Sequence, residues 1–144
     1  MKVLYDTSVL VAALLVNHPN HSLAFPKLEI VQRRVVHGYL STHSLAELYS
    51  VLTRLPEPLR VFPDEAQTAI ADLIDYFEAV PLLVEDYQSV IAQMVALNLP
   101  GGGVFDAVIA QAALKAEVAQ LLTFNPQDFV RLGDAIAQLV QVPE

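Results

Sequence analysis

The sequence predicts an α/β fold in which helices pack in layers against a mostly parallel sheet. Short apolar runs of β type alternate along the chain with longer segments whose apolar residues recur at helical spacing. The 144 residues suit one domain, so we expect a single domain over residues 1–144. Because 54% of the residues are hydrophobic, the chain can bury a sizeable core.

Five short runs are expected to form strands. The first, Val3-Leu4-Tyr5, ends directly at Asp6, and the others are apolar runs next to turn residues. The expected strands cover residues 3–5, 35–40, 80–84, 119–124 and, as an edge strand, 139–142.

Helices are expected between these strands, starting where a side chain can cap them. Expected caps are Thr7 or Ser8, Ser41 or Thr42, and Asp64. Pro26 is tolerable in the second helix only near its first turn. The helices cover residues 9–15, 22–33, 42–53, 64–77, 86–97, 104–116 and 126–130, and three prolines make residues 54–63 a loop.

The ends of two strands are the first candidate site, because ligands in parallel α/β sheets bind beyond the carboxyl ends of the strands. Asp6 follows the first strand directly, and Thr123 to Asp128 follow the fourth. We therefore expect these segments to meet at one edge of the sheet. Each also has a plain explanation, since Asp can cap a helix and an Asn-Pro segment is an ordinary turn.

Two further acids lie in otherwise apolar helices. Glu47 interrupts the Leu45 to Leu48 segment, where a buried carboxylate is costly unless it is paired or binds a metal. Asp106 is the one acid in the first turn of the helix after Gly101-Gly102-Gly103. The alternatives are a solvated face for Glu47 and a favourable helix-dipole position for Asp106. The glycines lack the Lys-Ser/Thr ending of a phosphate-binding loop.

Together, these carboxylates suit a hard cation such as Mg²⁺ or Mn²⁺. The chain has no cysteine and no His-x-x-x-His pair, which argues against zinc, and it has no Gly-x-Ser-x-Gly elbow of a serine hydrolase. His43 precedes Glu47 on the same helix and could approach the site, but a capping or surface role is the expected one. A formal net charge of −8 argues against a general nucleic-acid binder, but a bound cation reverses the local field of an acidic cluster.

Several segments together resemble the PIN domain family, and within it the VapC-type toxin ribonucleases of bacterial toxin–antitoxin pairs. The resemblance covers essentially the whole chain, and the segments occur in the family's order. It rests on Leu4 to Ser8, His43 to Leu48, the Arg54-Leu55-Pro56 clip, Gly102 to Ala110, and Leu121 to Asn125 with Asp128-Phe129.

The resemblance implies a three-layer α/β/α fold with a central, mostly parallel sheet. It also implies a metal-dependent endoribonuclease that uses Mg²⁺ or Mn²⁺ and a metal-activated water. By position, Asp6, Glu47 and Asp106 match the family's three core acids and would be the catalytic and metal-binding residues. Thr7 and Thr123 would place hydroxyl groups around them.

One position departs from the family pattern. Members often carry a fourth acid two residues after the Thr of the last motif, and Asn125 stands there in this chain. Either Asp128 substitutes as a metal ligand, or Asn125 orients a water through its amide.

Few basic residues are available to hold RNA. Arg54 and Arg60 flank the proline clip and are the substrate-binding candidates. Arg33 and Arg34 are weaker ones, because such a pair is more often a solvated helix end. A mean hydropathy of +0.44 predicts apolar surface that is covered in a homodimer, by a cognate antitoxin, or by both.

Two other functions stay open at this point. One is a non-catalytic PIN-like module that only binds a partner. The other is a phosphatase with Asp6 as nucleophile, which needs a second Asp where Ser8 stands. The lack of cysteine and the early acid at Asp6 favour a cytoplasmic protein with no signal peptide, and no apolar run approaches the roughly 18 residues of a membrane span.

Overall fold

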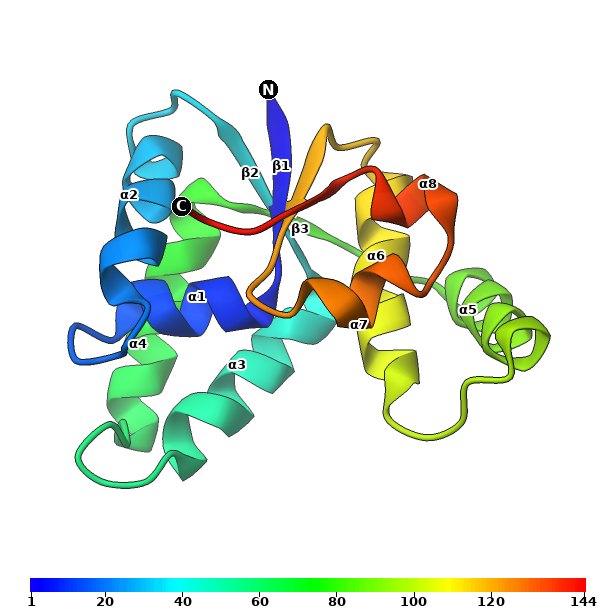
Figure 1. Ribbon diagram of the computed structural model, residues 1–144. Helices are drawn as coiled ribbons and strands as arrows, with labels where there is room; N and C mark the ends of the chain where they lie inside the picture. The colour runs from blue at the N-terminus through cyan, green and yellow to red at the C-terminus, as the bar shows by residue number, and fades with distance from the viewer.

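The computed structural model describes residues 1–144 as one parallel five-stranded sheet between two layers of helices (Figure 1). The strands are β1 (Lys2–Tyr5), β2 (His37–Ser41), β3 (Glu78–Val80), β4 (Gln120–Leu122) and β5 (Val140–Gln141). They lie in the order β3-β2-β1-β4-β5, so β1 is central. The predicted three-layer α/β/α fold with a parallel sheet is confirmed.

Each face of the sheet has its own hydrophobic core. Alternate residues of β1 divide between the two cores: Val3 and Tyr5 belong to one and Leu4 to the other. The first core packs against α1 (Thr7–Leu14), α2 (His21–Gln32), α3 (Thr42–Arg54) and α4 (Pro63–Tyr76). The second packs against α5 (Val84–Leu97), α6 (Gly103–Lys115), α7 (Pro126–Val130) and α8 (Asp134–Ala137). None of these helices is both long and apolar enough to cross a lipid bilayer.

The first helix begins earlier than the sequence predicts. Asp6 occupies the position before the helix with an extended backbone, and Thr7 is already helical. Neither Thr7 nor Ser8 is therefore the cap, and the Asp6 carboxylate makes no capping hydrogen bond either. In the third helix the predicted cap is confirmed, since Ser41 Oγ accepts from the backbone N–H of His43 at 3.2 Å.

The third strand lies at Glu78–Val80 and not at the predicted residues 80–84. Pro81 has no N–H to donate to the sheet, so the strand ends before it. The Asp86 carboxylate then accepts from the backbone N–H of Leu83 at 2.7 Å, which starts α5 at Val84.

Smaller differences concern element ends. The second, fourth and fifth strands are shorter than the sequence predicts or shifted at their ends, and α8 has no counterpart among the predicted helices. Pro26 lies in the second turn of α2, deeper than expected. The carbonyl of Ser22 that it leaves without a donor belongs to an exposed part of the helix, where water can bind it.

Candidate active site

Five of the predicted site residues line one pocket at the carboxyl edge of the sheet. Asp6 comes from the end of β1, Thr7 from the start of α1, Glu47 from α3, Asp106 from α6 and Asn125 from the segment after β4. The pocket has a volume of about 420 Å³. The parallel register explains why Asp6 and Asn125 meet, because β1 and β4 pair from Val3 with Gln120 to Tyr5 with Leu122 and end side by side.

Asp6 is the most buried acid of the site, with only 4% of its surface exposed. Its Oδ2 accepts two hydrogen bonds of 2.7 Å, from Ser8 Oγ and from Thr123 Oγ1. Each hydroxyl is itself fixed, because Ser8 Oγ accepts from the backbone of Phe124 at 3.1 Å and Thr123 Oγ1 accepts from the backbone of Asn125 at 2.9 Å. The carboxylate is therefore held in one orientation across β1 and β4.

The surroundings of Asp6 disfavour the ionised form of its carboxyl group. Burial raises its pKa most, and the charge of Glu47 raises it further, while the bonds from Ser8 and Thr123 act in the opposite direction. A cation at this edge would relieve the cost of burying the charge.

The surroundings of Asp106 also raise the pKa of its carboxyl group. Burial is the largest cause that raises its pKa to about 7, and the charges of Asp6, Asp128 and Glu47 add to it. The charge of Arg131 acts against this rise. The site is thus a cluster of like charges that keeps one proton near neutral pH in the absence of a cation.

His43 lies closer to the site than a surface role implies. Its Nε2 is 3.5 Å from Glu47 Oε2, one helical turn away. The other contact of the imidazole is with Phe105, whose ring lies parallel to it with centroids 5.5 Å apart. His43 Nε2 is buried and makes no hydrogen bond, so the imidazole lies between Glu47 and the α6 residue Phe105 and is not a surface or capping group.

The two predicted hydroxyl residues differ in what they do. Thr123 bonds Asp6 directly, whereas Thr7 does not. Thr7 Oγ1 is buried with no hydrogen-bond partner, and Thr7 lines the pocket. The hydroxyl that bonds Asp6 from this segment belongs to Ser8. A strand followed by Asp-Thr-Ser does not by itself tell which hydroxyl faces the carboxylate.

The remaining predicted residues lie around the pocket or away from it. Asp128 is half-buried and close enough to Asp106 to raise its pKa, but it does not line the pocket. Arg54 and Arg60 are exposed beside the proline clip and are not in the pocket wall either. Arg60 Nε donates to the Leu55 carbonyl at 2.9 Å.

Other residues of the site are not predicted by the sequence. His18 and Asn20, in the loop after α1, line the pocket, and Arg131, directly after α7, acts on Asp106 through its charge. No spacing in the sequence marks them, because their approach depends on how the loops fold. Arg33, in contrast, precedes the amino end of β2, at the opposite edge of the sheet from Asp6, so we assign it no role at the site.

The donor set fits a hard divalent cation. No three acidic or histidine side chains lie close enough to form a complete ligand set by themselves. Mg²⁺ does not need one, because it usually takes one or two carboxylates and keeps several waters. Asp6 and Asp106 supply such carboxylates, and the pocket adds the unpartnered Thr7 hydroxyl and the Asn125 amide.

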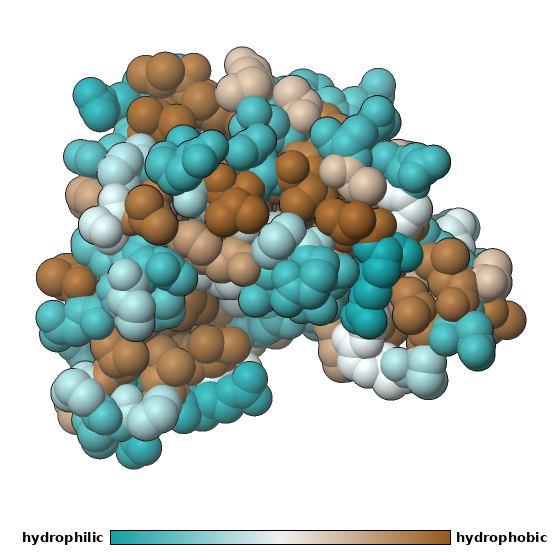
Figure 2. Space-filling model, in the orientation of Figure 1, coloured by the Kyte–Doolittle hydropathy of each residue, from teal (hydrophilic) through white to brown (hydrophobic).

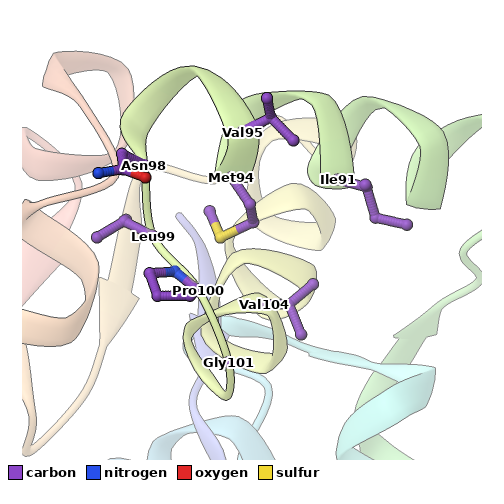
Figure 3. A pocket seen from close by; sticks show the side chains of 8 residues that line it. All are labelled: Ile91, Met94, Val95, Asn98, Leu99, Pro100, Gly101 and Val104. Atoms are coloured by element: carbon purple, nitrogen blue, oxygen red, sulfur yellow. The ribbon is translucent and has the colours of Figure 1, made fainter.

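A second hollow, of about 410 Å³, lies between α5 and α6 (Figure 3). It is lined mainly by apolar side chains, among them Ile91, Met94, Val95 and Val104. It contains no titratable group, so it offers binding surface and no acid–base chemistry.

Comparison with known proteins defines the class of the molecule. The chain belongs to the PIN domain family, whose sequence profile matches residues 3–135. It is 36% identical over 118 residues to Ribonuclease VapC40 of Mycobacterium tuberculosis, covering 82% of each chain. It is also 36% identical over 121 residues to Ribonuclease VapC27 of the same species, covering 79% of this chain and 80% of that protein.

Solved structures show the same fold at low sequence identity. The crystal structure of VapBC2 from Rickettsia felis, bound to a promoter DNA fragment, superposes with a TM-score of 0.70 at 18% identity over 100% of both chains. Mycobacterium tuberculosis VapC20, described as a toxin that cleaves the sarcin–ricin loop, gives 0.66 at 16% identity, covering 83% of this chain and 86% of that one.

Proposed function

We propose that the protein is a metal-dependent endoribonuclease and the toxin of a type II toxin–antitoxin pair. The observation that carries this proposal is the pocket in which buried Asp6 meets Glu47 and Asp106, in a PIN-domain chain whose curated relatives are named ribonucleases.

The proposed division of roles follows from where each acid lies. Asp6 and Asp106 would hold Mg²⁺ or Mn²⁺, and Glu47 would either join them or orient the attacking water. When bound, the ion supplies a water of lowered pKa and positive charge opposite the phosphate oxygens. Ser8 and Thr123 keep Asp6 in its orientation through their bonds to Oδ2, and the His43 imidazole packs beside Glu47, with Nε2 3.5 Å from Oε2. These contacts fix the acidic groups at the carboxyl edge of the sheet before substrate binds, and such pre-organisation lowers the free energy needed to reach the transition state.

One assay separates this proposal from its alternatives. The protein is incubated with an end-labelled RNA and, separately, with a phosphomonoester, each with Mg²⁺ and with excess chelator. Internal RNA cuts that need Mg²⁺ support the endoribonuclease. Phosphate release from the monoester without RNA cleavage would instead indicate the Asp-nucleophile phosphatase. No turnover of either substrate would indicate the partner-binding module.

The partner is proposed to be a protein antitoxin. Two of the similar folds are VapBC2 of Rickettsia felis and VapBC-1 of nontypeable Haemophilus influenzae. A hollow between α3 and α4 is lined by Tyr49, Pro63, Asp64, Gln67 and Ile70, beside the proline clip. Apolar side chains also gather around this loop and over α5 in Figure 2. A helix of the antitoxin, docked by its apolar face, suits such a groove.

We expect the purified chain to associate in the absence of the antitoxin. Large apolar side chains remain exposed on it, among them Phe62 at 71%, Val84 at 69% and Val95 at 75%. Light scattering should give a mass well above the 15.8 kDa of one chain, with a homodimer as the simplest assembly. A strictly monomeric, highly soluble protein at high concentration would contradict an obligate interface.

Asn125→Asp should tighten binding of Mn²⁺. The substitution adds one negative charge to a pocket wall that already contains three acids, and ligand charge strongly affects affinity for hard cations. We expect about a tenfold gain, the lower end of what outer groups contribute at metal sites. Calorimetric titration measures it.

The matched variant for Asn125→Asp is Asp128→Asn. It should weaken Mn²⁺ binding only if Asp128 has taken over the role of the fourth acid. Unchanged affinity in Asn125→Asp would show that residue 125 does not face the ion.

A further inference from the structure

Arg131 is the arginine whose charge acts on an acid of the site. It follows α7 directly, and its charge acts on Asp106, which lies one helical turn after Gly103 in α6. Its guanidinium lies against the backbone of Gly103, the first residue of α6. A Cβ atom at position 103 would stand only 2.9 Å from Arg131 Nη2. The approach of the guanidinium to α6 therefore depends on glycine at this position.

The guanidinium is not occupied by another acid. The close contacts between basic and acidic side chains join His43 to Glu47, Arg60 to Glu57 and Lys115 to Asp86, and none of them includes Arg131. Its Nε is 3.4 Å from the backbone carbonyl of Asp128, a long contact within one turn.

A free guanidinium beside an acidic metal-binding edge has a definite use. The chain carries a formal charge of −8, so RNA approaching Asp106 and Glu47 meets a repulsive field. The two forked N–H groups of an arginine match the oxygens of a phosphate.

We propose that Arg131, held against the Gly103 backbone, binds an RNA phosphate beside the acidic pocket and sets the position of the strand for cleavage. This inference rests on the proposed ribonuclease function. It makes Arg131 a substrate-binding residue, in addition to Arg54 and Arg60 at the proline clip.

Binding of a fluorescein-labelled single-stranded RNA, measured by anisotropy in excess chelator, tests the proposal without any cleavage. Arg131→Ala should weaken binding roughly 5–10-fold, below the range for a buried charged hydrogen bond because the side chain is exposed. The slope of log K against log salt should fall by about 0.7, the value for one phosphate contact on a single strand. Arg131→Lys should restore part of the affinity and most of the slope.

Arg33→Ala is the matched control, since it removes the same charge at the opposite edge of the sheet. It should leave both affinity and slope near the wild-type values. With Mg²⁺ present, Arg131→Ala should raise KM and leave kcat within about threefold of wild type.

Gly103→Ala tests the position of the guanidinium and not its charge. The new methyl group pushes aside a flexible side-chain end, so the fold should be kept, while RNA binding weakens in the same direction as in Arg131→Ala. In the Arg131→Ala background, Gly103→Ala should have no further effect, because the two residues act through one contact.

The outcomes that overturn the proposal are distinct from failure of the ribonuclease function. If Arg131→Ala and Arg33→Ala have the same RNA affinity, salt slope and KM while wild type cleaves RNA, the inference about Arg131 is rejected and the proposed ribonuclease function is not. The inference is also rejected if Arg131→Ala changes only Mn²⁺ affinity, because Arg131 is then a counter-ion of Asp106. Wild-type protein that cleaves no RNA with Mg²⁺ or Mn²⁺ rejects the proposed function itself.

Discussion

Asp6→Asn should abolish RNA cleavage. The loss of activity should exceed the roughly 100-fold seen when a residue that only contacts a metal ligand is replaced. The fold should persist, because an asparagine oxygen can still accept the hydrogen bonds from Ser8 and Thr123. Asp106→Asn should have a similar effect on activity. Without metal, both variants should be at least as stable as wild type, since each removes a charge from a repulsive cluster.

The measurement is cleavage of end-labelled RNA in Mg²⁺, with circular dichroism and thermal melting of the same samples. Asp72→Asn is a matched control, because it removes one exposed carboxylate from α4, away from the pocket. It should cleave RNA as wild type does. If Asp6→Asn and Asp106→Asn both cut RNA at the wild-type rate, the assignment of this pocket as the active site is wrong.

The metal-free protein should lose stability as the pH rises towards 7. The pKa of Asp106 is raised from 3.8 to about 7, so the folded chain holds a proton between these values that the unfolded chain has released. The relative stabilisation is complete below the ordinary carboxyl pKa and is lost as the pH rises through the folded value. The raised pKa of Asp6 acts in the same direction.

Mg²⁺ should reverse this trend, because a bound cation favours the ionised carboxylates and displaces the proton. Melting curves at pH 5.5 and pH 8, in chelator and in Mg²⁺, check both statements. Wild type should gain most from Mg²⁺ at pH 8. Asp106→Asn should melt higher than wild type at pH 8 in chelator and should respond little to Mg²⁺. A Mg²⁺ effect that is equal at both pH values would contradict the linkage.

Much of the fold can be predicted because its signals are local. The apolar run of β1 ends at an acid, and the Ser41 cap and the glycines before α6 mark where helices begin. The third strand is misplaced by sequence reasoning because Val80 to Val84 is almost entirely apolar. Its true position depends on the missing N–H of Pro81 and on the Asp86 carboxylate that starts α5.

The candidate site is less completely predictable, for a physical reason. Asp6, Glu47 and Asp106 are visible as acids in apolar surroundings, and the pairing of parallel strands brings them to one edge. The roles of Ser8 and Arg131 depend on side-chain direction and on loop paths, which leave no periodic signal. In the sequence, Ser8 is a possible helix cap, and it stands where an Asp-nucleophile phosphatase needs its second Asp. In the structure, its hydroxyl donates a hydrogen bond to Asp6.

The bond between Thr123 and Asp6 joins residues that are 117 positions apart in the chain. During synthesis the central strand β1 is made well before one of its two neighbours, β4. A growing chain that stops before β4 leaves one side of β1 without its partner and lacks the hydroxyl of Thr123. The order of synthesis thus delays the assembly of the acidic pocket until β4 and Thr123 have been made, so a chain that stops before them lacks one of the two hydrogen bonds that orient Asp6.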